Sequence, residues 1–354
     1  MAHALGLRGA IGLLLGAAVV LDLTTDAFIP KPGPGVMRRQ VQRPTQVSSN
    51  RLAMKMEIGP GSYVALVTPM SPNGQIDEEA LRELLRWHVE SGTDGIVALG
   101  TTGEASMLSS SERQRVLEIT AEECLDRVPI VAGTSSVNPS VVIEQTAQAA
   151  RYGADAVLVV TPAYVKPSQK GLIKFYETVA GEGALPVVLY NVPGRTAVDM
   201  QTSTVAELAK HPKIVGLKDA TGDLSRLGPL TEVCPEDFLL YSGDDETGME
   251  FVLGGGHGVV SVTANVAPRE ISAVMGASRT GDVQAASLIN EKVMQLHTKL
   301  FVQGNPVTVK YALARMGKIR DVLRLPLVPM EDDFKSEVDS ALESAGLLAA
   351  IPAV

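Results

Sequence analysis

The sequence predicts an α/β protein, a (β/α)₈ barrel that is followed by a small helical extension. Two observations support this prediction: short apolar runs alternate with helical patterns from residue 59 onward, and about 220 residues hold eight such units. A doubly wound sheet shares the alternation, but this number of units fits a closed barrel better. The expected strands are Tyr63–Val67, Gly95–Leu99, Pro129–Ala132, Ala156–Val160, Pro186–Tyr190, Ile214–Leu217, Phe238–Tyr241 and Gly258–Val262.

These runs are almost continuously apolar, which is typical of parallel strands that are buried on both faces. The segments between them show the spacing and the first-turn signals of helices. Residues 77–90, for example, open with three acidic residues and then place Leu81, Leu84 and Leu85 on one face. Such patterns predict helices over Asp77–Glu90, Ser110–Glu122, Ser140–Tyr152 and Gln201–Lys210.

Helical patterns replace the strands after Arg269. Asn305-Pro306 separates two of them, because a proline disfavours the helical conformation in the residue before it. The expected helices are Ser287–Phe301, Val307–Met316 and Asp332–Leu348. We therefore expect three parts, namely a targeting leader over residues 1–58, the barrel over residues 59–284 and the helical extension over residues 285–354.

Charge is unevenly distributed along the 354 residues, whose net charge is −9. Residues 1–60 hold seven basic and three acidic side chains, so the rest carries 24 basic and 37 acidic ones, a net charge of −13. An acidic body argues against nucleic acid as a partner, because phosphate contacts need a basic surface. Cys124 and Cys234 fit no metal or disulfide spacing, so both are expected to be reduced thiols.

The first 58 residues have the composition of a targeting leader. Arg8 precedes an apolar stretch over residues 10–21, which suits a signal peptide and is short for a membrane span. Phe28 then opens a basic tract without acidic residues up to Met56, which resembles the two-part leader of proteins sent to complex plastids. We expect a plastid location, with no membrane association of the mature form. The alternative is secretion, although secreted proteins more often use disulfides.

Lys218 closes the apolar run Ile214–Leu217 and opens a polar stretch over residues 219–223. Barrel enzymes hold their catalytic groups at the carboxyl ends of the strands, so this lysine is expected on the functional face. Burial disfavours its charged form, and a neutral amine can form an imine with a carbonyl compound. The structural alternative is that Lys218 merely pairs with Asp219 or Asp223.

Hydroxyl groups dominate the other strand ends, and no set of histidines and carboxylates converges there as a metal-dependent aldolase would need. A lysine among tyrosine and threonine hydroxyls suits a carbonyl reaction without metal or cofactor, in which the hydroxyls move protons. The histidines fall in the leader, on helices or in loops and are interpreted as structural: His3, His88, His211, His257 and His297.

Two glycine-rich segments could bind an anion. Residues 254–258 precede a strand and do not open a helix, so we interpret them as a turn that leads into the last strand. Residues 100–104, Gly-Thr-Thr-Gly-Glu, follow a strand and lead toward a helix. Their backbone N–H groups and hydroxyls can hold a small carboxylate.

Four segments together resemble the dihydrodipicolinate synthase family, in order and in spacing: Gly100–Glu104, Tyr190–Thr196, Gly216–Asp223 and Ser242–Asp245. The resemblance runs from about Gly59 to Leu348 and favours the catalytic interpretation of Lys218. It implies a lyase that condenses pyruvate with L-aspartate 4-semialdehyde, the first committed step of lysine biosynthesis by the diaminopimelate route. It also implies a homotetramer built as a dimer of dimers, with no metal or cofactor.

The resemblance assigns a role to each matching residue. Lys218 forms a Schiff base with pyruvate, and Tyr190 relays protons beside it. Thr101 links the hydroxyl of Tyr190 to that of Tyr164, which a neighbouring subunit supplies. Thr102 holds the pyruvate carboxylate. The remaining substrate-binding residues are Arg195, which grips the carboxylate of the second substrate, Gly243 and Val260.

Two alternatives remain open. Sister aldolases share the barrel and the lysine and act on sialic acid or on 2-keto-3-deoxy sugar acids, although the pair Thr101-Thr102, together with Tyr164 and Arg195, favours the synthase. A non-catalytic pyruvate-binding paralogue is the other. Within the synthase interpretation, Ala163, Val137 and Val141 replace polar residues or a tyrosine of the site at which lysine inhibits other members. A lysine effector needs its charges satisfied, so weak or absent inhibition is expected.

Overall fold

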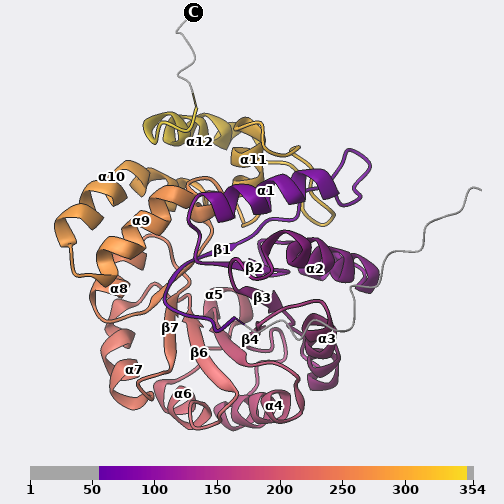
Figure 1. Cartoon of the computed structure of the whole chain (residues 1–354), viewed down its shortest axis with the longest axis vertical. Coiled ribbons are helices and arrows are strands. Elements are labelled where there is room, and N and C mark those ends of the chain that lie inside the picture. The colour runs from indigo at the N-terminus through magenta and orange to yellow at the C-terminus, as the bar shows by residue number, and fades with distance from the viewer. Residues whose placement is uncertain (1–55, 349–354) are drawn as a thin grey trace, which may run out of the picture. The chain divides into compact units, whose positions relative to one another are not determined.

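The computed structural model describes residues 56–348, which belong to one compact unit over residues 53–354. The leader expected over residues 1–58 therefore lies almost wholly outside the described residues. Eight parallel strands pair in chain order and close into a barrel, as the sequence predicts (Figure 1). They are β1 (Gly61–Ala65), β2 (Gly95–Ala98), β3 (Ile130–Gly133), β4 (Ala156–Val160), β5 (Val187–Asn191), β6 (Ile214–Asp219), β7 (Leu239–Ser242) and β8 (Gly258–Ser261).

Each expected strand is present, and its ends differ by at most two residues from the predicted ones. β5, β6 and β7 continue into polar residues because their hydrogen bonding extends beyond the apolar run, whereas β1, β2 and β8 end before the apolar residues Val67, Leu99 and Val262. β5 and β6 extend through Asn191 and Asp219, which are paired in register, as are Tyr190 and Lys218. The residues with chemical groups thus belong to the regular sheet, which fixes their directions.

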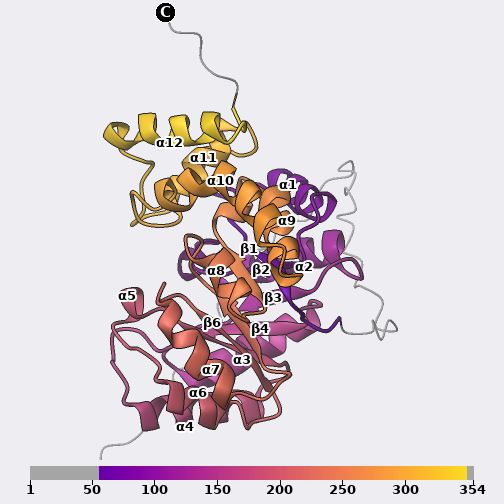
Figure 2. The ribbon, with the colours of Figure 1, turned by 90° about the vertical axis from the view of Figure 1, so that its left-hand side faces the viewer.

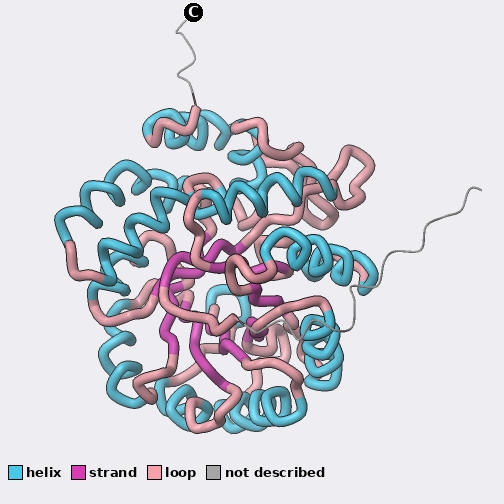
Figure 3. Tube along the Cα trace, viewed as in Figure 1, coloured by secondary structure: helices cyan, strands magenta, loops and turns pink. Residues whose placement is uncertain are grey.

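Helices surround the strands on the outside (Figure 3). Those of the barrel are α1 (Glu78–Glu90), α2 (Ser110–Cys124), α3 (Pro139–Arg151), α4 (Gln169–Glu182), α5 (Pro193–Thr196), α6 (Thr202–Leu208), α7 (Leu227–Val233), α8 (Gly248–Leu253) and α9 (Pro268–Arg279), with short 3₁₀ turns at η1 (Ala105–Met107), η2 (Leu224–Arg226) and η3 (Thr263–Asn265). α1 begins after Asp77, whose carboxylate accepts from the Ala80 backbone N–H. α2 begins after Ser109 with a capping box that Glu112 completes.

Three further helices follow the barrel: α10 (Val283–Lys299), α11 (Val307–Arg315) and α12 (Asp332–Ser344). Each predicted helix of this part is present. α10 packs along α9 and α12, and α11 packs against α12 (Figure 2). Among residues 56–348 no helix is long and apolar enough to cross a membrane.

The inside of the barrel is filled with side chains. Tyr63 and Tyr241 meet edge to face there, with ring centroids 5.2 Å apart. The Tyr241 hydroxyl donates to the Gly59 carbonyl at 2.7 Å, and the Tyr63 hydroxyl accepts from the Gly59 N–H at 3.0 Å. Both hydroxyl groups are therefore used in holding the segment before β1, which leaves the opposite end of the barrel for chemistry.

Candidate active site

Lys218 lies near the carboxyl end of β6, and only 5% of its surface is exposed. Its Nζ is 4.3 Å from the centroid of the Tyr190 ring. Neither candidate carboxylate pairs with it: Asp219 accepts from Arg226 Nε at 2.9 Å, and Asp223 accepts from Ser225. Lys218 is thus a buried amine beside a tyrosine, outside the ion pairs that the structural alternative required.

Gly243 provides the space for the lysine side chain. A Cβ at this position would lie 2.7 Å from Lys218 Cε and 2.6 Å from the Ala220 Cβ, closer than real contacts allow. The backbone N–H of Gly243 donates to the Asp219 carbonyl at 2.7 Å, so the strand end cannot move away easily. Gly243 is therefore required for packing around the amine, which gives a physical reason for its place in the predicted site.

Tyr190 and Val260 face the barrel interior. Tyr190 is 8% exposed on β5, Val260 is 4% exposed on β8, and both belong to the cluster of side chains inside the barrel. Tyr190 lies beside Lys218, whereas Val260 lines a small cavity together with Tyr63 and Tyr241.

The loop after β2 carries the expected carboxylate site. Leu99 and Glu104, at its two ends, have positive φ angles of 59° and 53°, so the backbone curls tightly between them. Thr101 is exposed, whereas Thr102 is buried and its Oγ1 accepts a hydrogen bond from Asn305 Nδ2 at 2.9 Å. The Thr68 hydroxyl donates to the Gly103 carbonyl at 2.7 Å. The loop is thus held from two directions.

Arg195 and Tyr164, like Thr101, are exposed members of the predicted set. Arg195 lies on the short helix α5, and its Nη2 donates to the Asn305 carbonyl at 3.5 Å. Tyr164 is 95% exposed in the loop after β4 and has a φ of 69°. In the described part of this chain, no hydrogen bond joins Thr101, Tyr164 and Tyr190. The geometry of one chain therefore brings together Lys218, Tyr190 and Gly243, places Val260 elsewhere in the barrel interior, and leaves the hydroxyl relay open.

Known proteins are similar to this chain over nearly all of the described residues. The model of the dihydrodipicolinate synthetase family matches residues 60–345. The chain belongs to this family. The 4-hydroxy-tetrahydrodipicolinate synthase of Laribacter hongkongensis is 48% identical over 288 residues, which are 81% of this chain and 99% of that protein. The chain is therefore a lyase with the activity of its family.

Solved structures agree with the architecture. The chloride-inhibited dihydrodipicolinate synthase from Acinetobacter baumannii, complexed with pyruvate, is 45% identical and has a TM-score of 0.81; the match covers 82% of this chain and all of that one. A dihydrodipicolinate synthase variant described as monomeric is 34% identical, with a TM-score of 0.80, and the match covers 82% of this chain and 98% of that one.

Two residues that contact the loop after β2, Lys310 and Asn305, were not predicted from the sequence. Lys310 on α11 is fully buried and forms an ion pair with Glu104, which is also fully buried, and it donates to the Thr68 carbonyl at 3.0 Å. The other carboxylate oxygen of Glu104 accepts from the Arg324 backbone N–H at 3.0 Å. Asn305 joins the same loop, although its sequence context indicated only a helix break. A lysine within an apolar helical pattern was the one available signal.

His297 has structural partners, and Cys124 is a buried thiol. His297 contacts the Thr263 hydroxyl at 3.0 Å and Asn290 Oδ1 at 3.1 Å, and burial lowers the pKa of its imidazole. Burial raises the pKa of the Cys124 thiol to about 12, and both cysteines are free thiols. Among residues 56–348 no group of three or more His, Cys, Asp or Glu side chains could hold a metal ion.

Proposed function

We propose that Lys218 forms a Schiff base with pyruvate, and that the resulting enamine attacks L-aspartate 4-semialdehyde. The observation that supports this most is the amine itself, which is 5% exposed, lies 4.3 Å from the Tyr190 ring and forms no ion pair within residues 56–348. The similar structure from Acinetobacter baumannii is complexed with pyruvate. When the methyl group of the pyruvate imine loses a proton, the protonated imine nitrogen takes up the electron pair of that C–H bond. No metal is therefore needed to form the enamine.

The steps balance without a further reactant. The amine adds to the pyruvate carbonyl carbon, water leaves, and the protonated imine loses a proton from its methyl group to give an enamine. The enamine carbon then attacks the aldehyde carbon, whose oxygen takes up a proton. Finally the substrate amine adds to the imine carbon and displaces Lys218, which closes the ring. In this scheme Tyr190 carries the proton during imine formation, with Thr101 and Tyr164 as its relay.

Two groups supply the carboxylate sites of the proposal. The Thr102 hydroxyl and neighbouring backbone N–H groups hold the pyruvate carboxylate. Arg195 holds the carboxylate of the aldehyde substrate, where its planar fork matches two oxygens. Gly243 completes the wall around the imine.

Borohydride reduction tests the chemistry. With pyruvate present, it is expected to fix an adduct on Lys218 that mass spectrometry of a proteolytic digest locates. A Lys218→Met variant should remain unlabelled and inactive, and an unlabelled Lys218 in the unmodified enzyme would refute the mechanism. Assays with pyruvate plus aspartate semialdehyde, with sialic acid and with ketodeoxygluconate separate the synthase from its sister aldolases. Activity is expected to persist after exhaustive dialysis against EDTA.

We further propose that the enzyme is a homo-oligomer, a tetramer of two dimers, in which Tyr164 serves the neighbouring site. Its 95% exposure supports this, because a relay tyrosine in water would be a poor proton carrier. The exposed apolar side chains Val137 and Val165, at 53% and 59%, suit the same contact. Weak or absent inhibition by lysine is part of the proposal, because Ala163, Val137 and Val141 offer an ammonium or carboxylate no partner. Submillimolar inhibition would refute it.

A plastid location is proposed from composition alone. Residues 28–56 hold basic residues and no acidic ones after an apolar segment, as in two-part plastid leaders. Residues 1–60 fused to a fluorescent protein should reach the plastid, whereas export from the cell would indicate secretion. A substitution of Phe28 by alanine is the sharpest variant, since it alters one residue of the leader and should divert the fusion.

A further inference from the structure

The helical extension contacts the proposed carboxylate site through one side chain. Asn305 lies just before α11, is 9% exposed, and donates from Nδ2 to Thr102 Oγ1 at 2.9 Å. We propose that Asn305 is a positioning residue, which turns the Thr102 hydroxyl proton toward the carboxylate of pyruvate. The inference rests on the proposed function and adds to it a group from outside the barrel.

The bond from Asn305 leaves the Thr102 hydroxyl with an unused donor. Thr102 Oγ1 has one proton to donate and can accept through its lone pairs. The amide N–H of Asn305 can only donate, so it occupies a lone pair and leaves the hydroxyl proton free. Within residues 56–348 no acceptor bonds that proton, although Thr102 is only 2% exposed. A buried hydroxyl with an unused donor suits an anionic ligand.

The loop and the extension are fixed to each other at a second place. Lys310 and Glu104, both fully buried, form an ion pair, and Lys310 also donates to the Thr68 carbonyl. The Arg324 backbone N–H donates to the same carboxylate at 3.0 Å. A buried pair with additional hydrogen bonds tolerates little displacement, because breaking it would leave a buried charge. The ion pair therefore keeps Asn305 within reach of Thr102.

The backbone of Asn305 touches the other proposed substrate site. Its carbonyl accepts from Arg195 Nη2 at 3.5 Å, whereas its side chain contacts Thr102. A substitution of the side chain removes the bond to Thr102 and keeps the carbonyl. The proposal therefore predicts an effect on pyruvate that is not matched by an effect on aspartate semialdehyde, which a general loosening of the structure would not produce.

The first experiment measures the pyruvate concentration that gives half-maximal borohydride labelling of Lys218. For Asn305→Ala it should rise about 5- to 30-fold, since a hydrogen bond to a charged group is weakened. The KM for aspartate semialdehyde should change by less than about two-fold, because Arg195 keeps its backbone partner. Asn305→Asp should raise the half-maximal pyruvate concentration further than Asn305→Ala does, because a carboxylate accepts the Thr102 proton and repels pyruvate. If Asn305→Asp raises this concentration no more than Asn305→Ala does, the proposed direction of the hydrogen bond from Asn305 to Thr102 is wrong.

A double-mutant cycle shows whether Asn305 acts through Thr102. Thr102→Val keeps the shape and removes the hydroxyl, and should raise the half-maximal pyruvate concentration about 10- to 100-fold. Adding Asn305→Ala to Thr102→Val should change the half-maximal pyruvate concentration by less than about two-fold. In a Thr102→Ser background, which keeps the hydroxyl, Asn305→Ala should still raise this concentration. Independent, multiplicative effects of the two substitutions would refute the inference.

Asn290→Ala provides the matched control. This asparagine lies on α10 in the same extension, is 3% exposed, and contacts His297 instead of the loop. It should lower the melting temperature without changing the pyruvate requirement. If this control raises the half-maximal pyruvate concentration as much as Asn305→Ala does, the effect of Asn305 comes from the stability of the extension and not from its bond to Thr102. Failure of the proposed function is distinct, because the unmodified enzyme would then remain unlabelled at every pyruvate concentration.

Discussion

Space around Lys218 matters as much as the functional groups that surround it. Gly243 leaves no room for even one additional carbon atom between Lys218 Cε and Ala220. The amine must add to a carbonyl carbon and then hold the imine near Tyr190, so a small displacement changes the reacting geometry. At the scale of single residues, a glycine without a reactive group is therefore a critical part of the site.

Gly243→Ala tests this requirement. The added Cβ should push Lys218 or the Ala220 backbone aside and lower kcat/KM by about 10²-fold, since misplacement by about 1 Å can cost that much. Gly228→Ala is the control: it lies on α7, nothing approaches its Cβ within 4 Å, and alanine favours helix. Steady-state kinetics and circular dichroism check both. Unchanged kinetics in Gly243→Ala would contradict the packing argument.

The sequence alone points to candidate residues whose surroundings are local. Lys218 was predicted because it ends an apolar strand, and its register with Tyr190 follows from the barrel. Asn305 and Lys310 were missed because their partners, Thr102 and Glu104, lie more than 200 residues away in the chain. A contact of this kind depends on how the extension docks, and no periodic pattern encodes it.

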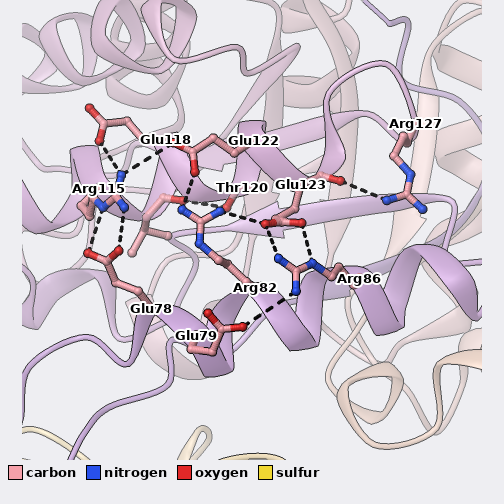
Figure 4. Close-up of polar contacts among 11 residues, drawn as sticks. Glu78, Glu79, Arg82, Arg86, Arg115, Glu118, Thr120, Glu122, Glu123 and Arg127 are labelled. Atoms are coloured by element: carbon pink, nitrogen blue, oxygen red, sulfur yellow. Dashed lines mark hydrogen bonds and ion pairs between the residues drawn. The ribbon is translucent and has the colours of Figure 1, made fainter. Parts of the chain in front are cut away.

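At the scale of elements, α1 and α2 are joined by a lattice of charged side chains (Figure 4). Glu123 is at its centre: it accepts two bonds from Arg86, at 2.8 and 2.9 Å, and one from Arg82 at 2.8 Å. Arg115 makes a two-pronged contact with Glu78 at 2.6 and 2.9 Å. The arginine side chains beside Glu123 hold the pKa of its carboxyl below the usual range.

Glu123→Gln should lower the free energy of unfolding by about 1 kcal/mol at low salt, since shared, two-pronged pairs exceed isolated surface pairs. Added salt should reduce the difference, because it screens the exposed part of the lattice. Glu207→Gln removes a single exposed pair between Glu207 on α6 and Lys210 just after it, and should cost a few tenths of a kcal/mol at most. Urea titrations at two salt concentrations measure both. A larger loss in Glu207→Gln would contradict the lattice argument.

Element prediction succeeded where one pattern dominated. All eight strands were predicted because each is buried on both sides, and α1 and α2 because acidic or capping residues mark their beginnings. The short helices α5, α7 and α8 were not predicted, and neither were the longer α4 and α9, although the seven-residue α6 was. Packing on the barrel, more than local propensity, determines these helices.

At the scale of the whole molecule, one buried histidine makes stability depend on pH. His88 on α1 is fully buried, contacts the Thr93 hydroxyl at 3.2 Å, and has no partner for Nε2 among the described residues. Burial, with a smaller contribution from the charge of Lys318, lowers the pKa of its imidazole to about 3. The unfolded chain takes up a proton near pH 6.5, and the folded chain does not.

Stability should therefore fall as the pH decreases from 6.5 toward 3, with a slope from this residue of up to about 1.4 kcal/mol per pH unit. His88→Asn keeps a partner for Thr93 and removes the titration. It should be less stable than the unmodified enzyme at pH 7, and the difference should shrink as the pH decreases. Melting temperatures at pH 7, 6, 5 and 4 measure this. A difference that does not change with pH would show that His88 has the same pKa in the folded and unfolded chains.

In the proposed assembly each active site combines residues of two subunits, because Tyr164 of one subunit relays protons to the site that contains Lys218 of another. Tyr164→Phe should lower kcat about 10²-fold, and Lys218→Met should abolish activity. When the two variants are unfolded together and refolded, a mixed dimer contains one site with an intact lysine and an intact tyrosine from the partner. Activity should then rise well above the sum of the separate variants. Additive activity would place the relay within one chain, which the 95% exposure of Tyr164 argues against.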